Sequence, residues 1–241
     1  MKKISIENLE KEFNIGYFKK QSFLRWLLSF ISGREPKKQI KVLDNISFHV
    51  NSGEILGLVG SNGSGKSTLL RIIAGIYKHD KGDVVTNTKI ISIINLGIAL
   101  KDRLTMKDNI FLAGSLFGMS QKDIESKFDS IVEFSGLKEF VNTKIYQFSN
   151  GMLQRLAFSI SIHANPGILL LDEFFEVGDE DFRNKSSNKI KELGEEGVCV
   201  IFVSHELEKM EKYCSRIIWL DNSRIKEIGD PKEIIEKYRN S

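Results

Sequence analysis

A glycine-rich loop between an apolar run and a helical pattern constrains this chain more than any other feature. The apolar run 55–59 precedes the loop and a periodic segment, 69–74, follows it. The loop reads Gly60, Ser61, Asn62, Gly63, Ser64, Gly65, Lys66, Ser67 and Thr68. This order predicts a phosphate loop, in which backbone N–H groups surround a nucleoside triphosphate. We expect Lys66 to contact the outer phosphates and the Ser67 hydroxyl to ligate Mg²⁺ at the helix N-terminus.

The rest of the chain alternates apolar runs with helical patterns, which predicts an α/β sheet covered by helices on both faces. The expected strands are 4–6, 40–43, 46–50, 55–59, 90–94, 168–171, 198–203 and 216–220. A further run, 225–228, follows Asp221-Asn222-Ser223, so a hairpin is expected there. Between 104 and 164 the helical patterns 106–117, 121–134, 137–140 and the segment after Gly151 follow one another without a strand. We therefore expect a helical subdomain inserted at 100–165.

Composition limits the class of protein further. The chain has 241 residues, 41% of them hydrophobic, which suffices for the core of one nucleotide-binding domain over 1–241. A formal charge of +3 does not demand a nucleic-acid partner. Cys199 and Cys214 are too few for a disulfide framework, so both are expected to be reduced. The alternating start of the chain is unlike a secretory signal, and no apolar run is long enough to cross a bilayer. If the function involves a membrane, another chain must span it.

Two carboxylates end one of the expected buried strands. The run 168–171 leads directly into Asp172 and Glu173. In a phosphate-loop protein, the first carboxylate at such a strand end holds Mg²⁺ through water, and the second polarises an attacking water molecule. We expect Asp172 and Glu173 to have these two roles.

A second loop, 148–155, precedes that strand and opens a helical pattern. It reads Phe-Ser-Asn-Gly-Met-Leu-Gln-Arg, and Ser149 and Gly151 at a helix N-terminus form an anion site that suits a γ-phosphate. Together with the phosphate loop, Asp172-Glu173, Gly178-Asp179 and Val203-Ser204-His205, this loop resembles the signature loop of ATP-binding cassette (ABC) ATPases. The resemblance covers nearly the whole chain.

The resemblance implies a fold, cofactors and further site residues. The fold is a phosphate-loop core with a mixed sheet, an antiparallel β subdomain and the helical subdomain, and the cofactors are ATP and Mg²⁺. In the family, two copies close on two ATP molecules. Ser149, Asn150, Gly151 and Asp179 then reach the ATP of the opposite copy.

Three further residues take their roles from the same resemblance. His205 stands where the family has the switch histidine that contacts the γ-phosphate and assists the catalytic Glu173. Asn95 stands where most cassettes have a glutamine near the metal ion and the water, and its carbonyl offers the same chemistry over a shorter reach. Phe13 fits the place of the aromatic residue that stacks on adenine. Tyr17 is an alternative for that role, and Phe13 could equally be an ordinary core residue.

An aromatic-rich segment at 18–38 is longer than a simple cassette needs. Its apolar residues cover most of the circumference of a short helix, and basic residues flank it. Such a helix packs on its own domain, or it meets a membrane surface or the cytosolic end of a transporter. It resembles the gate helix of polysaccharide-exporting cassettes. The signature loop resembles the same subfamily in its Ser-any-Gly-Met form.

The function expected from this resemblance is that of an ATPase subunit in an exporter. The partners are a second copy and an integral membrane subunit, docked near 100–106, that carries a lipid-linked glycan of the O-antigen, capsule or teichoic acid type. The place is the cytoplasmic face of the bacterial inner membrane. We expect no carbohydrate-binding domain after Ser241, so the choice of glycan falls to the membrane subunit. The alternatives are a cassette of another transporter class, or a soluble cassette ATPase acting on ribosomes or DNA. The second lacks support because the chain has one cassette, no heptad run and no dense basic block.

Overall fold

The structure is a computed structural model that describes residues 1–15, 38–93, 100–172, 179–204 and 206–241. The strands are β1 (Lys2–Ile15), β2 (Lys38–Asn51), β3 (Ile55–Val59), β4 (Lys81–Thr86), β5 (Ile90–Ile93), β6 (Ile168–Asp172), β7 (Cys199–Val203), β8 (Arg216–Asp221) and β9 (Arg224–Gly229). The α-helices are α2 (Lys66–Ile73), α4 (Met106–Leu116), α5 (Gln121–Ser135), α6 (Asn150–His163), α7 (Glu180–Glu195), α8 (Leu207–Tyr213) and α9 (Pro231–Arg239). Two short 3₁₀ helices are η1 (Lys138–Phe140) and η2 (Ile145–Gln147).

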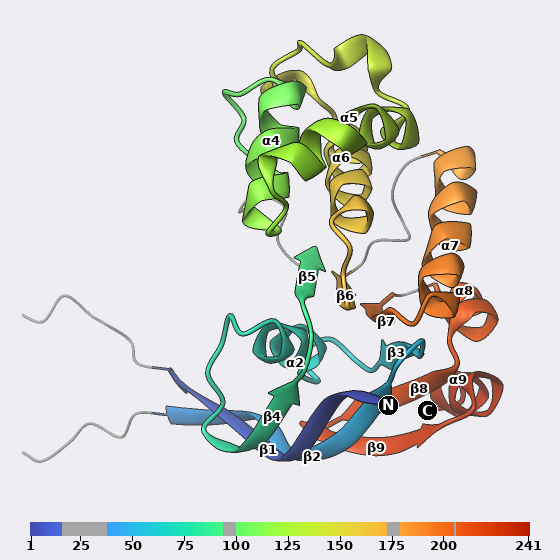
Figure 1. The fold of residues 1–241 in the computed structure, drawn as a ribbon. Coiled ribbons are helices and arrows are strands. Elements are labelled where there is room, and N and C mark those ends of the chain that lie inside the picture. Colours follow the sequence, from blue (N-terminus) through green and yellow to red (C-terminus); the bar gives the residue numbers. More distant parts are fainter. Residues whose placement is uncertain (16–37, 94–99, 173–178, 205) are drawn as a thin grey trace, which may run out of the picture.

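Two sheets form the lower part of the molecule in Figure 1. The first is antiparallel, in the order β2-β1-β4, and the second has the order β5-β6-β7-β3-β8-β9. In the second sheet β5, β6, β7, β3 and β8 are parallel, and only β9 runs antiparallel, as the partner of β8 in a hairpin. The carboxyl ends of five parallel strands therefore meet at one edge of this sheet, which is where ligands bind in α/β proteins.

The buried side chains form two clusters, one on each face of the larger sheet. One cluster joins the inner face of β1 and β2 to α2 and to β3, β6 and β7. The other cluster joins the opposite face of the sheet to α6, α7, α8, α9 and the helices above them. Strands β3, β6 and β7 are buried over almost their whole length, which explains why they appear in the sequence as unbroken apolar runs. The thiol of Cys199 lies in the first cluster, and burial raises its pKa to about 12.

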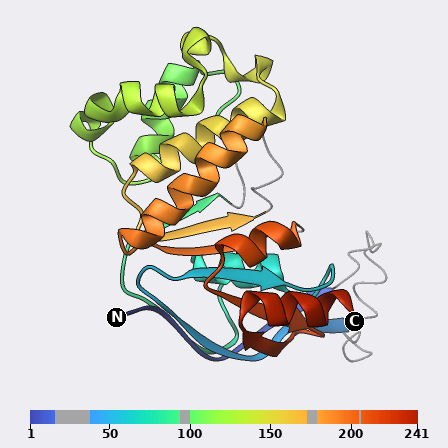
Figure 2. The same ribbon diagram turned by 90° about the vertical axis from the view of Figure 1, so that its right-hand side faces the viewer.

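Helices α4, α5 and α6 form a group above β5 and β6, as Figures 1 and 2 show. Both α4 and α5 begin with a capping box, in which Thr105 pairs with Asp108 and Ser120 pairs with Asp123. These pairs satisfy the N–H groups at the helix starts and so fix where each helix begins. None of the helices within the described ranges has the length and apolar content that crossing a bilayer requires.

The structure differs from the expected elements in four places. The expected strand 4–6 is part of the longer β1, so Phe13 lies within this strand. The runs 40–43 and 46–50 belong to one strand, β2, because both remain paired with β1; the register only shifts between them, where Asn45 takes a positive φ of 53°. Strand β4 was not anticipated, since its residues alternate only between exposed and half-buried. The pattern 137–140 gives a 3₁₀ turn, η1, rather than an α-helix. The expected helix at 18–38 lies largely outside the described residues.

Candidate functional site

The phosphate loop runs from β3 into α2 as the sequence predicts. Lys66 begins α2, and its ammonium donates hydrogen bonds to the carbonyl oxygens of Gly60 (2.7 Å) and Ser61 (2.9 Å). These bonds fold the lysine back across the loop. Lys66 is only 9% exposed, so its charge is held at a nearly buried position inside the curve of the loop. A cation held there suits a polyphosphate ligand.

At two positions of the loop, neighbouring strands leave no room for a side chain, so glycine is required. A Cβ atom at Gly60, whose φ is +151°, would lie 2.2 Å from the carbonyl oxygen of Leu220 on β8. A Cβ atom at Gly65, whose φ is +106°, would lie 2.7 Å from the carbonyl oxygen of Val42 and 2.7 Å from the side chain of Leu43. The loop is therefore pressed between β8 on one side and β2 on the other.

The first turn of α2 is open to an anion. Gly65 is its N-cap residue and provides no side-chain cap, and no acidic residue stands in the first turn. The positive end of the helix dipole and its N–H groups are therefore not neutralised by a carboxylate there. The hydroxyl of Ser64 is buried without a hydrogen-bond partner, which is costly unless a ligand supplies one. Ser67 and Thr68 are half-buried in the same turn.

The register of the sheet brings Asp172 to the level of the phosphate loop. Val203, at the end of β7, is paired with Leu58 of β3 on one side and with Asp172 of β6 on the other. Val59, the next residue of β3, leads into the loop. Strand β6 is the second strand from β3 in the sheet, and Asp172 lies at the same carboxyl edge as the end of β3. The apolar run together with the phosphate loop predicted that Asp172 ends a buried strand, and its role as a Mg²⁺ ligand stays a prediction.

Several predicted site residues lie outside the described residues. These are Glu173, His205 and Asn95, together with Gly178 and the alternative adenine residue Tyr17. The described chain stops at Ile93 on β5 and at Asp172 on β6, and each of these ends precedes one of those residues in the sequence. Their roles stay predictions.

The signature loop presents its polar residues to solvent. Ser149 is the N-cap residue of α6, and its hydroxyl oxygen accepts a hydrogen bond from the N–H of Met152 (3.2 Å). Phe148 is buried and packs edge-on against Phe140, which anchors the loop to the helices. Ser149 and Asn150 are exposed, and Gly151 is half-buried. The first turn of α6 contains no acidic residue, so this helix start is also suited to an anion.

Asp179 is tied to the signature helix by Arg155. One carboxylate oxygen of Asp179 caps α7 by accepting from the N–H of Phe182 (2.8 Å), and the other accepts from the Arg155 guanidinium (3.0 Å). Arg155 also donates to the carbonyl oxygen of Ser135 (2.8 Å) and lies over the Phe182 ring. The sequence argument quoted Arg155 but gave it no role. Asp179 is thus joined to the signature helix α6 at the start of α7. The phosphate loop and Asp172 lie on other elements, namely β3, α2 and β6.

Phe13 lies near the end of β1 and is half-buried. Its ring meets the ring of Tyr77 edge-on, with 5.6 Å between centroids, and Lys11 lies over it at 5.2 Å. Tyr77 in turn lies under Arg71 of α2. Sequence reasoning did not single out Tyr77, although its place just after the phosphate-loop helix was a usable signal. The pair of Phe13 and Tyr77 therefore lies beside Arg71 of α2, and the adenine role of Phe13 stays a prediction.

Comparisons with known proteins identify the family. The family model described as "ABC transporter" matches residues 43–176, which is more than half of the chain. The chain is 40% identical over 199 residues to the O-antigen export system ATP-binding protein RfbB of Klebsiella pneumoniae, covering 83% of this chain and 81% of the relative. The chain belongs to the ABC transporter family. The resemblance seen in the motifs is thereby confirmed.

Further relatives and solved structures agree with this membership. The teichoic acids export ATP-binding protein TagH of Listeria innocua is 38% identical over 236 residues, covering 98% of this ABC chain and 69% of the relative. An O-antigen export protein RfbB of Myxococcus xanthus is 35% identical, and the chain spans 51% of its length. The ATP-binding subunit of an ABC transporter superposes with a TM-score of 0.77 at 21% identity, covering 98% of this chain and 93% of the other. A dimeric ATP-binding cassette in a post-hydrolysis state with ADP and Pi also has a TM-score of 0.77, at 23% identity, covering 95% and 98%. These structures confirm the predicted fold class.

Proposed function

We propose that this chain is the ATP-binding and ATP-hydrolysing subunit of an ABC exporter for a lipid-linked polysaccharide of the O-antigen, capsule or teichoic acid type. The observation that carries the proposal is the similarity, over most of the chain, to relatives named as O-antigen and teichoic acid export ATP-binding proteins. The phosphate loop supports it independently, since its open helix start and nearly buried lysine are suited to a triphosphate.

ATP binds along the phosphate loop in this account. Backbone N–H groups of Gly63 to Thr68 surround the phosphates, and Lys66 turns from the loop carbonyls toward the outer phosphates. The unpartnered hydroxyl of Ser64 gains a phosphate oxygen as its partner. Phe13 stacks on the adenine beside Tyr77.

Mg²⁺ fits the oxygen donors at the edge of the sheet. The hydroxyl of Ser67 and the carboxylate of Asp172 are the ligand types that Mg²⁺ prefers, and Asn95 adds a carbonyl oxygen. The register that places Asp172 level with the phosphate loop supports this assignment. When bound, Mg²⁺ offsets the negative charge of the phosphates. Glu173 acts as the base that orients the attacking water, and His205 assists it and contacts the γ-phosphate.

Two copies close on two ATP molecules, and each copy completes the site of the other. Ser149, Asn150 and Gly151 meet the γ-phosphate of the ATP on the opposite copy, and Asp179 meets its phosphate loop. The exposure of Ser149, Asn150 and Asp179 in the single chain supports a role toward a second molecule. The Arg155 guanidinium joins Asp179 to the signature helix. This contact supports the proposal that Asp179 and the signature loop reach the opposite copy together.

Closure of the dimer drives a separate integral membrane subunit that carries the glycan. This subunit docks near 100–106 and the helices α4 to α6, and the segment 18–38 has the role of a gate at the substrate entrance. The ATPase then works as a peripheral protein on the cytoplasmic face of the inner membrane. No nucleic-acid partner enters this account.

Steady-state ATP hydrolysis by the purified chain tests the enzymatic part of the proposal. We expect Mg²⁺-dependent hydrolysis that Lys66→Met abolishes together with ATP binding, while the exposed Lys232→Met on α9 keeps both. Unchanged hydrolysis in Lys66→Met would contradict the assignment of the phosphate loop as the active site.

A further inference from the structure

Strand β2 lies between Phe13, the proposed adenine-stacking residue, and the phosphate loop. On β2, Ile40 is paired with Phe13 of β1, and Val42 and Leu43 are the residues against which Gly65 packs. Only Lys41 lies between these two contacts. The position of β2 at Lys41 therefore sets how far the adenine-stacking residue stands from the phosphate loop.

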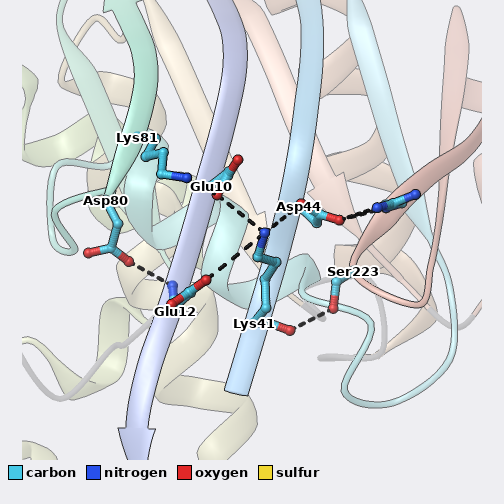
Figure 3. A network of polar contacts seen from close by, with 8 residues as sticks. Glu10, Glu12, Lys41, Asp44, Asp80, Lys81 and Ser223 are labelled. Carbon is cyan, nitrogen blue, oxygen red and sulfur yellow. Dashed lines mark hydrogen bonds and ion pairs between the residues drawn. The ribbon is translucent and has the colours of Figure 1, made fainter. Parts of the chain in front are cut away.

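The side chain of Lys41 joins three acidic residues on two strands, as Figure 3 shows. Its ammonium lies 2.8 Å from Asp44 and 3.3 Å from Glu10, with Glu12 at 4.0 Å. Hydrogen bonds from Lys81 and then Lys41 lower the pKa of Glu10, and hydrogen bonds from Lys41 and then Arg224 lower the pKa of Asp44. Hydrogen bonds to Asp44 and then Glu10 raise the pKa of Lys41. These contacts therefore favour the charged forms of Glu10, Asp44 and Lys41 at neutral pH.

The backbone of β2 at this point is also fixed to the β8–β9 hairpin. The carbonyl oxygen of Lys41 accepts from the Ser223 hydroxyl (2.9 Å), and the N–H of Asp44 donates to the carbonyl of Ser223 (2.8 Å). Arg224 donates to the carboxylate of Asp44 (2.7 Å). The hairpin itself touches the loop, since Gly60 packs against Leu220 of β8.

The pairing between β1 and β2 is irregular next to Lys41. The register between β1 and β2 shifts between Leu9 and Lys11 and again between Lys11 and Glu12. Shifts of this kind mark bulges, where ladder hydrogen bonds are disrupted and the strand bends. The side-chain contacts of Lys41 bridge the two strands at this irregular point.

We propose that Lys41 is a positioning residue for nucleotide binding, which sets the distance between the adenine-stacking end of β1 and the phosphate loop. The proposal rests on the proposed function, in which Phe13 stacks on adenine. Lys41 acts through Phe13 and β2 and does not touch the nucleotide. Its loss should weaken binding of a whole nucleotide and leave binding of the phosphates alone unchanged.

The test compares two probes on the full-length chain by isothermal titration calorimetry. The probes are the non-hydrolysable ATP analogue AMP-PNP and inorganic tripolyphosphate, each with Mg²⁺. We expect Lys41→Met to raise the Kd for AMP-PNP by about three- to ten-fold and to leave the Kd for tripolyphosphate within about two-fold. Lys41→Arg should restore most of the AMP-PNP affinity, because its cation still reaches the carboxylates.

Two further variants keep the test decisive. Lys81→Met removes the other lysine that contacts Glu10, from β4, and should change neither Kd. If Lys41→Met does not fold, Asp44→Asn weakens the same contacts with little change in size, and we expect the same selective loss. Equal loss of both probes, or no loss of either, overturns the role of Lys41.

Phe13→Ala separates this inference from the proposed function. A selective loss of AMP-PNP affinity in Phe13→Ala, with an unselective effect of Lys41→Met, overturns only the role of Lys41. An unchanged AMP-PNP affinity in Phe13→Ala overturns the adenine role of Phe13 and the role of Lys41 with it.

Discussion

Arg155 of the signature helix donates a hydrogen bond to the carboxylate of Asp179 over 3.0 Å, and this contact joins α6 to the start of α7. The same guanidinium holds the carbonyl oxygen of Ser135 and covers the ring of Phe182. A Cβ atom at Gly136 would lie 2.2 Å from Arg155, so the turn after α5 is shaped around this side chain. Residues proposed to act on the opposite copy are thus positioned together.

Replacing Arg155 should separate ATP binding from turnover. We expect Arg155→Met to keep the ATP affinity of the single chain and to lower steady-state hydrolysis by roughly ten-fold, because misplaced groups on the opposite copy slow a reaction that depends on their geometry. Arg155→Lys should not rescue it, since lysine lacks the planar fork that reaches Ser135 and Asp179 together. The exposed Arg239→Met on α9 is the matched control. Full hydrolysis by a folded Arg155→Met variant would show that this contact has no catalytic consequence.

Glycine substitutions test how closely the phosphate loop packs. Gly65→Ala adds both a strained φ and a collision with β2, whereas Gly75, with φ +72°, has nothing within 4 Å of an added Cβ. We expect Gly75→Ala to lower the free energy of unfolding by about 1 kcal/mol, and Gly65→Ala by about 2–4 kcal/mol with loss of ATP binding. Urea denaturation measures both values. An equal loss of free energy of unfolding in Gly65→Ala and Gly75→Ala would contradict close packing of β2 against the loop.

Glu173→Gln should retain ATP binding and lose turnover by at least about 100-fold, since the amide cannot act as a base. ATP-bound dimers should then accumulate, which size-exclusion chromatography with light scattering detects. Glu236→Gln, an exposed change on α9, should behave like the unmodified chain. Hydrolysis at the normal rate by Glu173→Gln would remove this residue from the mechanism.

His163 should make the protein less stable in mild acid. Its imidazole lines a cavity of about 370 Å³ with Lys127 and Lys189, and it hydrogen-bonds the carbonyl oxygen of Ser159 (2.7 Å). Burial lowers its pKa below the usual 6.5, and the nearby lysines add to this effect. Below the unfolded pKa, the unfolded chain therefore binds more protons than the folded chain, so stability falls as the pH falls.

His163→Gln should reduce that loss, because its amide can donate to Ser159 but does not titrate in this range. The measurement is the free energy of unfolding in urea at about pH 7.5 and about pH 5.5. The difference between the two pH values should be smaller in His163→Gln than in the unmodified chain, and His79→Gln serves as a control. An identical pH dependence in His163→Gln and the unmodified chain would exclude His163 as its source.

The buried strands were predictable, and the half-exposed strand β4 was not. Strands β3, β6 and β7 are fully enclosed, so their apolar runs marked them clearly. Strand β4 is half-exposed along its length and owes its existence to pairing with β1, which no local pattern records. The register shift at Asn45 likewise depends on pairing with a distant strand.

The loop between β3 and α2 was predictable for another reason. Its residues are contiguous in sequence, and their spacing is dictated by the ligand rather than by the rest of the fold. The contacts of Arg155 with Asp179 and of Phe13 with Tyr77 join residues that are 24 and 64 positions apart. Lys41 gave no signal either, because a lysine beside acidic residues in sequence is ordinary. Contacts of this kind depend on tertiary structure and could be found only there.

The most direct test of the central claim is to purify the tagged Glu173→Gln variant from solubilised membranes with ATP and Mg²⁺ and to identify the bound proteins and lipids by mass spectrometry. We expect a polytopic membrane protein together with a polyprenyl-linked glycan. A membrane transporter with another cargo would contradict polysaccharide export and leave the ATPase in place. Recovery of ribosomes or DNA without any membrane protein would contradict the transport function itself.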